Sequence, residues 1–227
     1  MSLPASQPIP PQSSAPLPPA RSRRRNRSLV DLSLDERSAF VRQLAQRLSP
    51  GADFFFFSAF SGAAVAVALL LDTPALYILA ALLAPFMAPV AGLSLATVVG
   101  SFRYFFETLA SILIGALIVF LFGLLGGVAA NFLPGLTFQQ TIFHTYFSWP
   151  DFVLLTLGAA LTTLLLVRAP QSRPLVTSVA LAYELYLPVG VAGFGLTSGV
   201  PGLWPDGLIV FAVHLGWAAL FGTIMLA

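Results

Sequence analysis

Six long apolar stretches dominate the sequence after residue 52 and restrict what this chain can fold into. They cover residues 53–71, 75–99, 104–126, 151–168, 175–198 and 206–227. A helix needs about 20 mainly apolar residues to cross a bilayer. Only 9% of the 227 residues are charged, whereas a soluble domain has roughly 25%. We therefore predict an all-α, polytopic membrane protein with six transmembrane helices.

The positions of the basic residues predict how these spans are oriented. All 11 are arginine, and eight of them lie within residues 21–47. If that segment is cytoplasmic, Arg103, Arg168 and Arg173 fall on the same side, as the preference for positive charge in cytoplasmic loops requires. The loops on the opposite side contain no Arg or Lys; they are residues 72–74, 127–150 and 199–205. We predict a protein of the inner (plasma) membrane with both termini cytoplasmic, and no nucleic-acid partner.

Two segments precede the first span. Residues 1–28 are rich in Pro, Ser and Arg, which predicts a disordered leader. Residues 29–50 carry leucines at helical intervals, with Ser33 and Glu36 at capping-box spacing, which predicts an amphipathic juxtamembrane helix. This helix either lies on the lipid surface or crosses solvent as a linker.

The loop of residues 127–150 is predicted to contain structure of its own. Thr137 and Gln140 have capping-box spacing and several aromatic residues follow, so we expect a short interfacial helix there. The tripeptide Trp-Pro-Asp ends this loop and recurs before the sixth span, so that Asp151 and Asp206 begin equivalent spans. An acidic residue at this position favours the positive end of a helix dipole, and we interpret both as structural.

Two similar short stretches indicate an internal repeat. The stretch "VAGLSLA" at residues 90–96 lies in the second span, and "VAGFGLT" at residues 191–197 lies in the fifth. The two units would be residues 53–126 and 151–227. Because each unit has three spans, the second copy is inverted in the membrane, an arrangement common in transporters.

Prolines interrupt the second and the fifth span. Pro85 and Pro89 lie one turn apart in the second, and Pro188 lies close to Gly190 in the fifth. A proline in a helix interior removes a hydrogen bond at a cost of about 3 kcal/mol. We predict that both helices are broken and that the breaks meet at a site. The alternative is two ordinary proline kinks relieved by neighbouring helices.

Few ionisable residues lie inside the spans, and two of them are candidates for a site. Glu184 lies four residues before Pro188, where a charged side chain costs on the order of 3 kcal/mol unless it faces protein or water. It is either an ion-binding group or a neutral structural acid. His214, in the sixth span, is either a site residue or makes an interhelical hydrogen bond. Tyr183 flanks Glu184 and either lines a cavity or packs.

The composition excludes several classes of site. The chain has no cysteine and two histidines, which excludes Cys-ligated and His-rich metal sites. We expect no metal site and no cofactor. No nucleotide-binding loop, metalloprotease motif or serine-hydrolase elbow occurs, so we expect no enzyme. An intramembrane enzyme would require Glu184 and His214 to face one cavity.

Two stretches carry a resemblance to a known family. The stretch "LAPFMAPVAG" in the second span resembles the double-proline motif of the bacterial and archaeal membrane family called domain of unknown function 389. The matching positions are Ala84, Pro85, Met87, Pro89 and Gly92. The stretch "YLPVGVAGFG" resembles the second motif of that family at Pro188 and Gly193, although the family usually has Pro-Pro where this chain has Leu187-Pro188. The resemblance covers most of residues 53–227, implies the same topology and supplies no substrate.

Two functions fit these features. We expect a small transporter or channel-like protein for an ion or small solute, with its site where the broken spans meet. The candidate residues of that site are Glu184, His214, Pro85, Pro89, Pro188 and Tyr183. Because one copy is small, we expect a homo-oligomer in the lipid bilayer, with a small solute or cation as the other partner. The alternative is a non-transporting scaffold or partner-binding membrane protein.

Overall fold

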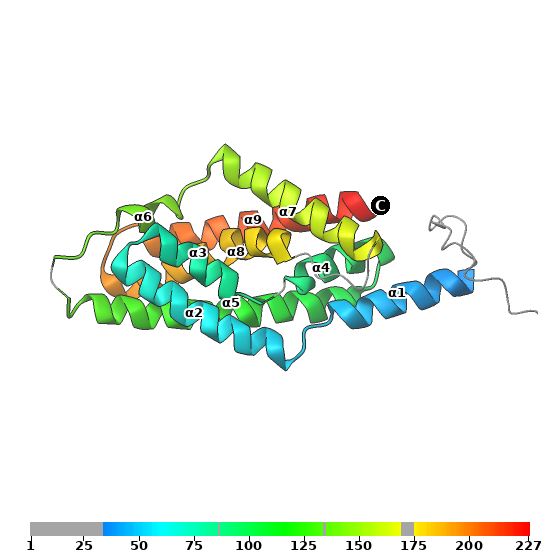
Figure 1. The fold of residues 1–227 in the computed structure, drawn as a ribbon, viewed down its shortest axis with the longest axis horizontal. Helices are drawn as coiled ribbons and strands as arrows, with labels where there is room; N and C mark the ends of the chain where they lie inside the picture. Colours follow the sequence, from blue (N-terminus) through cyan, green and yellow to red (C-terminus); the bar gives the residue numbers. More distant parts are fainter. Residues whose placement is uncertain (1–33, 86, 134, 169–174) are drawn as a thin grey trace, which may run out of the picture. The chain divides into compact units, whose positions relative to one another are not determined.

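Every regular element in the described part of the chain is a helix (Figure 1). The computed structural model describes residues 34–85, 87–133, 135–168 and 175–227. The helices are α1 (Leu34–Leu48), α2 (Ala52–Leu71), α3 (Pro74–Leu83), α4 (Ala88–Val99), α5 (Phe102–Ala130), α6 (Gln139–Phe143), α7 (Trp149–Arg168), α8 (Leu175–Ser198) and α9 (Leu203–Leu226). The predicted leader, residues 1–28, lies outside the described residues, as do Ser33 and Arg173. The chain divides after Val41 into a small N-terminal unit and a larger one, Arg42–Ala227, that contains α2 to α9.

Four helices of the described chain, α2, α5, α8 and α9, are long and apolar enough to cross a membrane. Helices α3 and α4 together are apolar enough for a fifth span, but they meet at an angle of 60°, so the pair is either a broken span or a re-entrant loop. Helix α7 is apolar over Trp149–Leu165, which is shorter than the roughly 20 residues that a transmembrane helix needs. The protein is thus a multi-pass membrane protein, while the sixth span and the inverted repeat stay predictions.

The bend between α3 and α4 lies at the two prolines of the second span, as predicted. Pro85 follows the end of α3 and is buried. Pro89 occupies the first turn of α4, where a backbone N–H has no helical partner to lose. The backbone N–H of Met87 donates to the hydroxyl of Ser178 in α8 at 2.7 Å. A donor freed by the bend is therefore satisfied by protein, as the membrane interior requires.

The predicted break in the fifth span is wrong. Helix α8 runs without interruption from Leu175 to Ser198, with Pro188 inside it. Pro188 has no N–H to donate to the carbonyl of Glu184, one turn earlier. The ring of His214 in α9 bonds to that carbonyl instead, with 2.9 Å between Nδ1 and the oxygen. A residue of a neighbouring helix thus replaces the lost hydrogen bond, and α8 continues through the proline.

Helix α8 is enclosed by other helices, and it contacts α2, α3, α5, α7 and α9. Glycines make the contact with α5 close: a Cβ at Gly123 would overlap the carbonyl of Gly190, and a Cβ at Gly193 would overlap the carbonyl of Phe120. Small residues commonly allow membrane helices to pack backbone against backbone. As a result, 78% of the residues in the apolar 18-residue stretch of α8 are buried, whereas the corresponding share is 44% or less in α2, α5 and α9.

The last turns of α1 pack on α4 and α5. Leu44 and Leu48 are buried, and the hydroxyl of Tyr104 in α5 donates to the carbonyl of Ala45 at 3.3 Å. The helix predicted within residues 29–50 is therefore present as α1. The sequence predicted that this helix lies on lipid or crosses solvent. Its C-terminal end instead packs against other helices of the protein.

Candidate functional site

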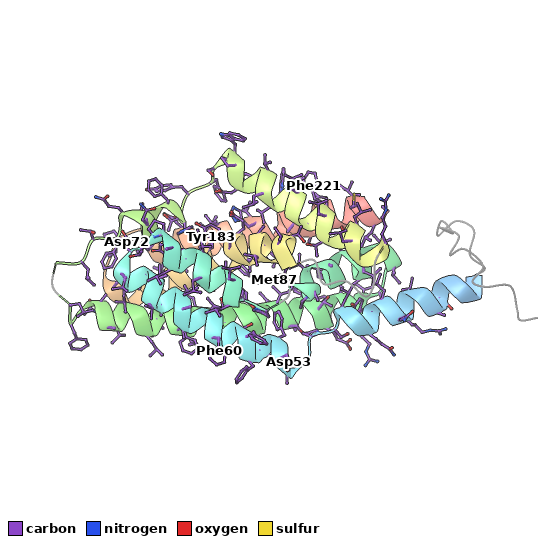
Figure 2. All side chains as sticks on the ribbon, in the orientation of Figure 1. Asp53, Phe60, Asp72, Met87, Tyr183 and Phe221 are labelled. Carbon is purple, nitrogen blue, oxygen red and sulfur yellow. The ribbon has the colours of Figure 1, made fainter. Side chains whose placement is uncertain are left out.

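A pocket with a volume of about 230 Å³ opens among α7, α8, α9 and the segment after α6. Its lining combines ionisable and aromatic residues: Phe143, His144, Tyr146, Ser148, Asp151, Tyr183, Glu184, Pro188, Val210 and His214. Figure 2 shows Tyr183 between Asp72 and Met87 along the long axis of the view, with Asp72 nearer the end where α6 lies. The described residues at the bend between α3 and α4 do not line the pocket.

Three ionisable side chains meet in this pocket, one from each of its long helices. Asp151 of α7, Glu184 of α8 and His214 of α9 each have a potential ligand atom within 4.8 Å of those of the other two. Glu184 is 6% exposed and His214 is 1% exposed. The Nδ1 atom of His214 and the Oε2 atom of Glu184 are 3.5 Å apart. Buried ionisable groups among apolar helices need polar partners or water, and these three residues provide polar neighbours for one another.

The hydrogen bond to the carbonyl of Glu184 determines which nitrogen of His214 is free. A carbonyl oxygen can only accept, so Nδ1 carries the hydrogen, and Nε2 of the neutral ring then has an unshared electron pair. Within the described part of the chain, Nε2 is buried and has no hydrogen-bond partner. Unpartnered buried polar atoms are rare in folded proteins. The Nε2 atom is thus available to a small ligand or ion.

Asp151 is placed at this cluster by the start of α7. It is the third residue of the helix, and its Oδ2 atom accepts the backbone N–H of Ser148 at 3.2 Å, which fixes the side chain at the helix terminus. The second Trp-Pro-Asp tripeptide places Asp206 in the first turn of α9. Asp206 does not line the pocket. The same tripeptide therefore supplies a pocket residue in α7 and not in α9.

Aromatic rings border the pocket on the side of α6. The ring of His144 lies between those of Tyr77 in α3 and Tyr183 in α8, at centroid distances of 5.0 and 5.5 Å. Desolvation lowers the pKa of His144 to about 4, so this ring is neutral near pH 7. His144 therefore adds a polar nitrogen to the pocket lining but no positive charge.

The loop after α5 is anchored by Asp72, which ends α2 in the left-handed conformation with a φ of 46°. Its carboxylate accepts the backbone N–H groups of Gln140 and Thr141 at 3.0 and 2.9 Å. It also accepts the hydroxyls of Thr141 and Tyr77 at 3.0 and 3.2 Å. The short helix expected in this loop is present as α6, but Asp72 caps it from another helix and the predicted cap at Thr137 is not found.

Comparison with known proteins gives a family for this chain. Residues 81–221 match the family described as domain of unknown function (DUF389). The chain belongs to this family. No curated protein and no solved structure matches it. The matched part of this DUF389 protein contains the double-proline stretch and every pocket-lining residue, whereas α2 lies outside it.

The structure of this DUF389 protein brings four of the six predicted site residues together. The four that line the pocket are Glu184, His214, Tyr183 and Pro188. Pro85 and Pro89 lie at the bend between α3 and α4 and do not line it. The two proline stretches therefore do not meet at one site, because α8 has no break and the bend contacts α8 at Ser178 instead.

Sequence reasoning missed a carboxyl group and an imidazole of the DUF389 pocket, those of Asp151 and His144. The repeated Trp-Pro-Asp tripeptide draws attention to Asp151, but it draws equal attention to Asp206. Asp151 lines the pocket and Asp206 does not because different residues surround the starts of α7 and α9. The local sequence does not show these surroundings. His144 lies in a loop, and Asp72, distant in sequence, holds the preceding helix in place.

Proposed function

We propose that this protein is a small membrane transporter or channel-like protein for a cation, which binds in the pocket of Asp151, Glu184 and His214. The observation that carries the proposal is the meeting of these three side chains, from three helices, in one pocket of an otherwise apolar unit. Ionisable residues at such positions are costly and commonly belong to ion or substrate pathways.

The charges around the pocket favour a cation. Two carboxyl groups line it, and no arginine is among its described lining residues. With His144 neutral, no fixed positive charge opposes a bound cation, and a recess of one charge sign attracts ions of the other. Glu184 and His214 also meet the condition stated above for an intramembrane enzyme. We prefer ion binding because two carboxyl groups line the pocket and its described lining contains no arginine or lysine.

The proposal includes the predicted six-span topology in the inner membrane, with both termini cytoplasmic. Helix α7 would be the fourth span and the α3–α4 pair the second. The arginine distribution supports this orientation and puts the pocket on the outer side. The inverted repeat would relate the unit of α2 to α5 to the unit of α7 to α9, although only the first has an interrupted central span, the α3–α4 pair. A homo-oligomer would cover part of the apolar surface that α5 exposes.

Cation flux in proteoliposomes tests the proposal. The full-length protein would be reconstituted, and currents and internal ion indicators recorded after concentration jumps of Na⁺, K⁺, Mg²⁺, Mn²⁺ and Zn²⁺. We expect flux of at least one cation that Glu184→Gln reduces by about tenfold or more, since it removes an ionic contact in the pathway. Glu107→Gln is the matched control, because Glu107 is exposed and pairs with Arg103 away from the pocket.

A folded, reconstituted protein that moves none of these ions would contradict transport. That result would favour the scaffold alternative, in which the pocket is only a packing feature. Equal loss of flux in Glu184→Gln and Glu107→Gln would also contradict the assignment of the pathway to this pocket.

A further inference from the structure

We propose that the pocket binds one divalent transition-metal ion of the Zn²⁺ or Mn²⁺ class, with Asp151, Glu184 and His214 as its protein ligands. The inference names the cation of the proposed function and rests on this pocket being the cation site. The sequence did not predict it, because neither the number of histidines nor their spacing resembles a metal motif. The three ligands come together only through the packing of α7, α8 and α9.

The hydrogen bonding of His214 is that of a metal ligand. Ligating histidines usually donate their other ring N–H to a backbone carbonyl or a carboxylate, which fixes the ring and the tautomer. In this protein Nδ1 donates to the carbonyl of Glu184 at 2.9 Å. Nε2 keeps its electron pair and, within the described residues, has no partner. The carbonyl is free to accept because Pro188 cannot bond to it.

The spacing of the three side chains suits a single ion. Donors bound to one Zn²⁺ at about 2.0–2.2 Å lie roughly 3–4 Å from one another. One ring nitrogen of His214 and one carboxylate oxygen from each of Asp151 and Glu184 lie within 4.8 Å of one another, so the two carboxyl side chains can turn toward an ion at the imidazole while the ring keeps its bond to the carbonyl. Three protein ligands leave at least one coordination position open, as in sites where the metal meets water or substrate. An open position suits an ion that must also leave.

The mixture of donors selects the class of ion. Mg²⁺ and Ca²⁺ are bound mainly by oxygen ligands. An imidazole nitrogen beside carboxylates suits divalent ions such as Mn²⁺, Fe²⁺, Co²⁺ and Zn²⁺. The chain has no cysteine, so the thiolate ligands that favour softer ions such as Cu⁺ are missing from it.

Co²⁺ titration tests the inference directly. The full-length protein, purified without a polyhistidine tag and treated with a chelator, would be placed in lipid nanodiscs and titrated with Co²⁺ while the visible absorption is recorded. We expect one Co²⁺ per chain, displaced by Zn²⁺ and not by a large excess of Mg²⁺ or Ca²⁺.

Three conservative variants and one matched control locate the site. We expect Asp151→Asn, Glu184→Gln and His214→Gln each to weaken Co²⁺ binding by about tenfold or more, since even outer-shell changes have effects of that size. Asp206→Asn changes the equivalent acid of the second Trp-Pro-Asp tripeptide, which lies outside the pocket, and should keep wild-type affinity. X-ray absorption of the Zn²⁺-loaded wild type should show one imidazole among oxygen ligands, a measurement that needs no variant to fold.

Several results would overturn the inference. They are the absence of Co²⁺ binding by the wild type, affinity unchanged in all three pocket variants, equal displacement by Mg²⁺ or Ca²⁺, and an absorption spectrum without imidazole. Metal binding without flux in the proteoliposomes would contradict the proposed transport and leave the metal site standing. The two proposals therefore fail in distinguishable ways.

Discussion

His214 donates its Nδ1 hydrogen to the backbone carbonyl of Glu184, the carbonyl that Pro188 leaves without a helical partner. The contact at 2.9 Å has two consequences. It allows α8 to continue through a proline, and it leaves Nε2 of His214 without a hydrogen-bond partner among the described residues, on a side chain that lines the same pocket as Asp151 and Glu184. In the sequence, Pro188 predicts a helix break. In the structure, it leaves a carbonyl that holds the imidazole of His214 in one orientation.

Pro188→Ala tests this relationship. Alanine restores a backbone N–H that can bond to the carbonyl of Glu184 within α8, so the ring of His214 has to share this acceptor and is oriented less firmly. We expect Co²⁺ affinity to fall by about tenfold, while the thermal unfolding midpoint does not decrease, because the helical hydrogen bond is regained. Co²⁺ titration and thermal unfolding by circular dichroism measure the two effects. Wild-type affinity in this variant would show that the carbonyl does not orient the ring.

Gly123→Ala and Gly193→Ala test the packing of α5 on α8. Each added Cβ would overlap a backbone carbonyl of the other helix, and overpacking of this kind costs about 1–3 kcal/mol. Gly216→Ala in α9 is the matched control, since nothing lies within 4 Å of its added Cβ. Alanine is the better helix former, so this control should be neutral or stabilising by up to about 1 kcal/mol. Equal unfolding midpoints for all three variants would contradict the close approach of the helices.

Asp72→Asn tests the anchor of the α6 loop. Asparagine tolerates the left-handed backbone at this position, but its side chain has one acceptor oxygen in place of the two that accept from Gln140 and Thr141. We expect faster amide hydrogen exchange over residues 139–144 and little change within the long helices. Asp53→Asn, in the first turn of α2, serves as the control. Unchanged exchange over the loop would show that other contacts hold α6.

The absence of cysteine makes the orientation directly testable. Thr137→Cys lies in the α6 loop and Gln46→Cys lies in α1, and both positions are exposed. With the arginine-rich side cytoplasmic, a membrane-impermeant maleimide should label Thr137→Cys in intact cells and Gln46→Cys only after permeabilisation. Labelling in the reverse pattern would invert the topology and place the pocket on the cytoplasmic side.

The helical elements could be predicted from the sequence because they depend on local composition. The apolar stretch at residues 53–71 became α2 with nearly the same bounds. The bend of the second span could be predicted from Pro85 and Pro89, because proline has no backbone N–H and interrupts the hydrogen bonds of a helix. Helix α5 extends beyond its predicted range of residues 104–126 at both ends, because Ser101 caps its start and Gly126 does not end it.

The features that escaped prediction depend on partners distant in sequence. Whether Pro188 breaks its helix was decided by His214, which follows it on another helix. Whether Asp151 or Asp206 belongs to the pocket was decided by the neighbours of α7 and α9, although the two tripeptides are identical. Glu184, His214 and Tyr183 could be chosen from the sequence because polar groups within apolar spans are few, and the structure places all three in the lining of the pocket.

Anomalous diffraction at the Zn absorption edge, from crystals of the full-length protein grown in lipid and soaked with Zn²⁺, tests the central claim most directly. The account predicts one anomalous peak among Asp151, Glu184 and His214, about 2.0–2.2 Å from a ring nitrogen and from carboxylate oxygens. A pocket without an anomalous peak, in crystals whose other Zn²⁺ sites are occupied, would contradict the assignment of these three residues as a cation site.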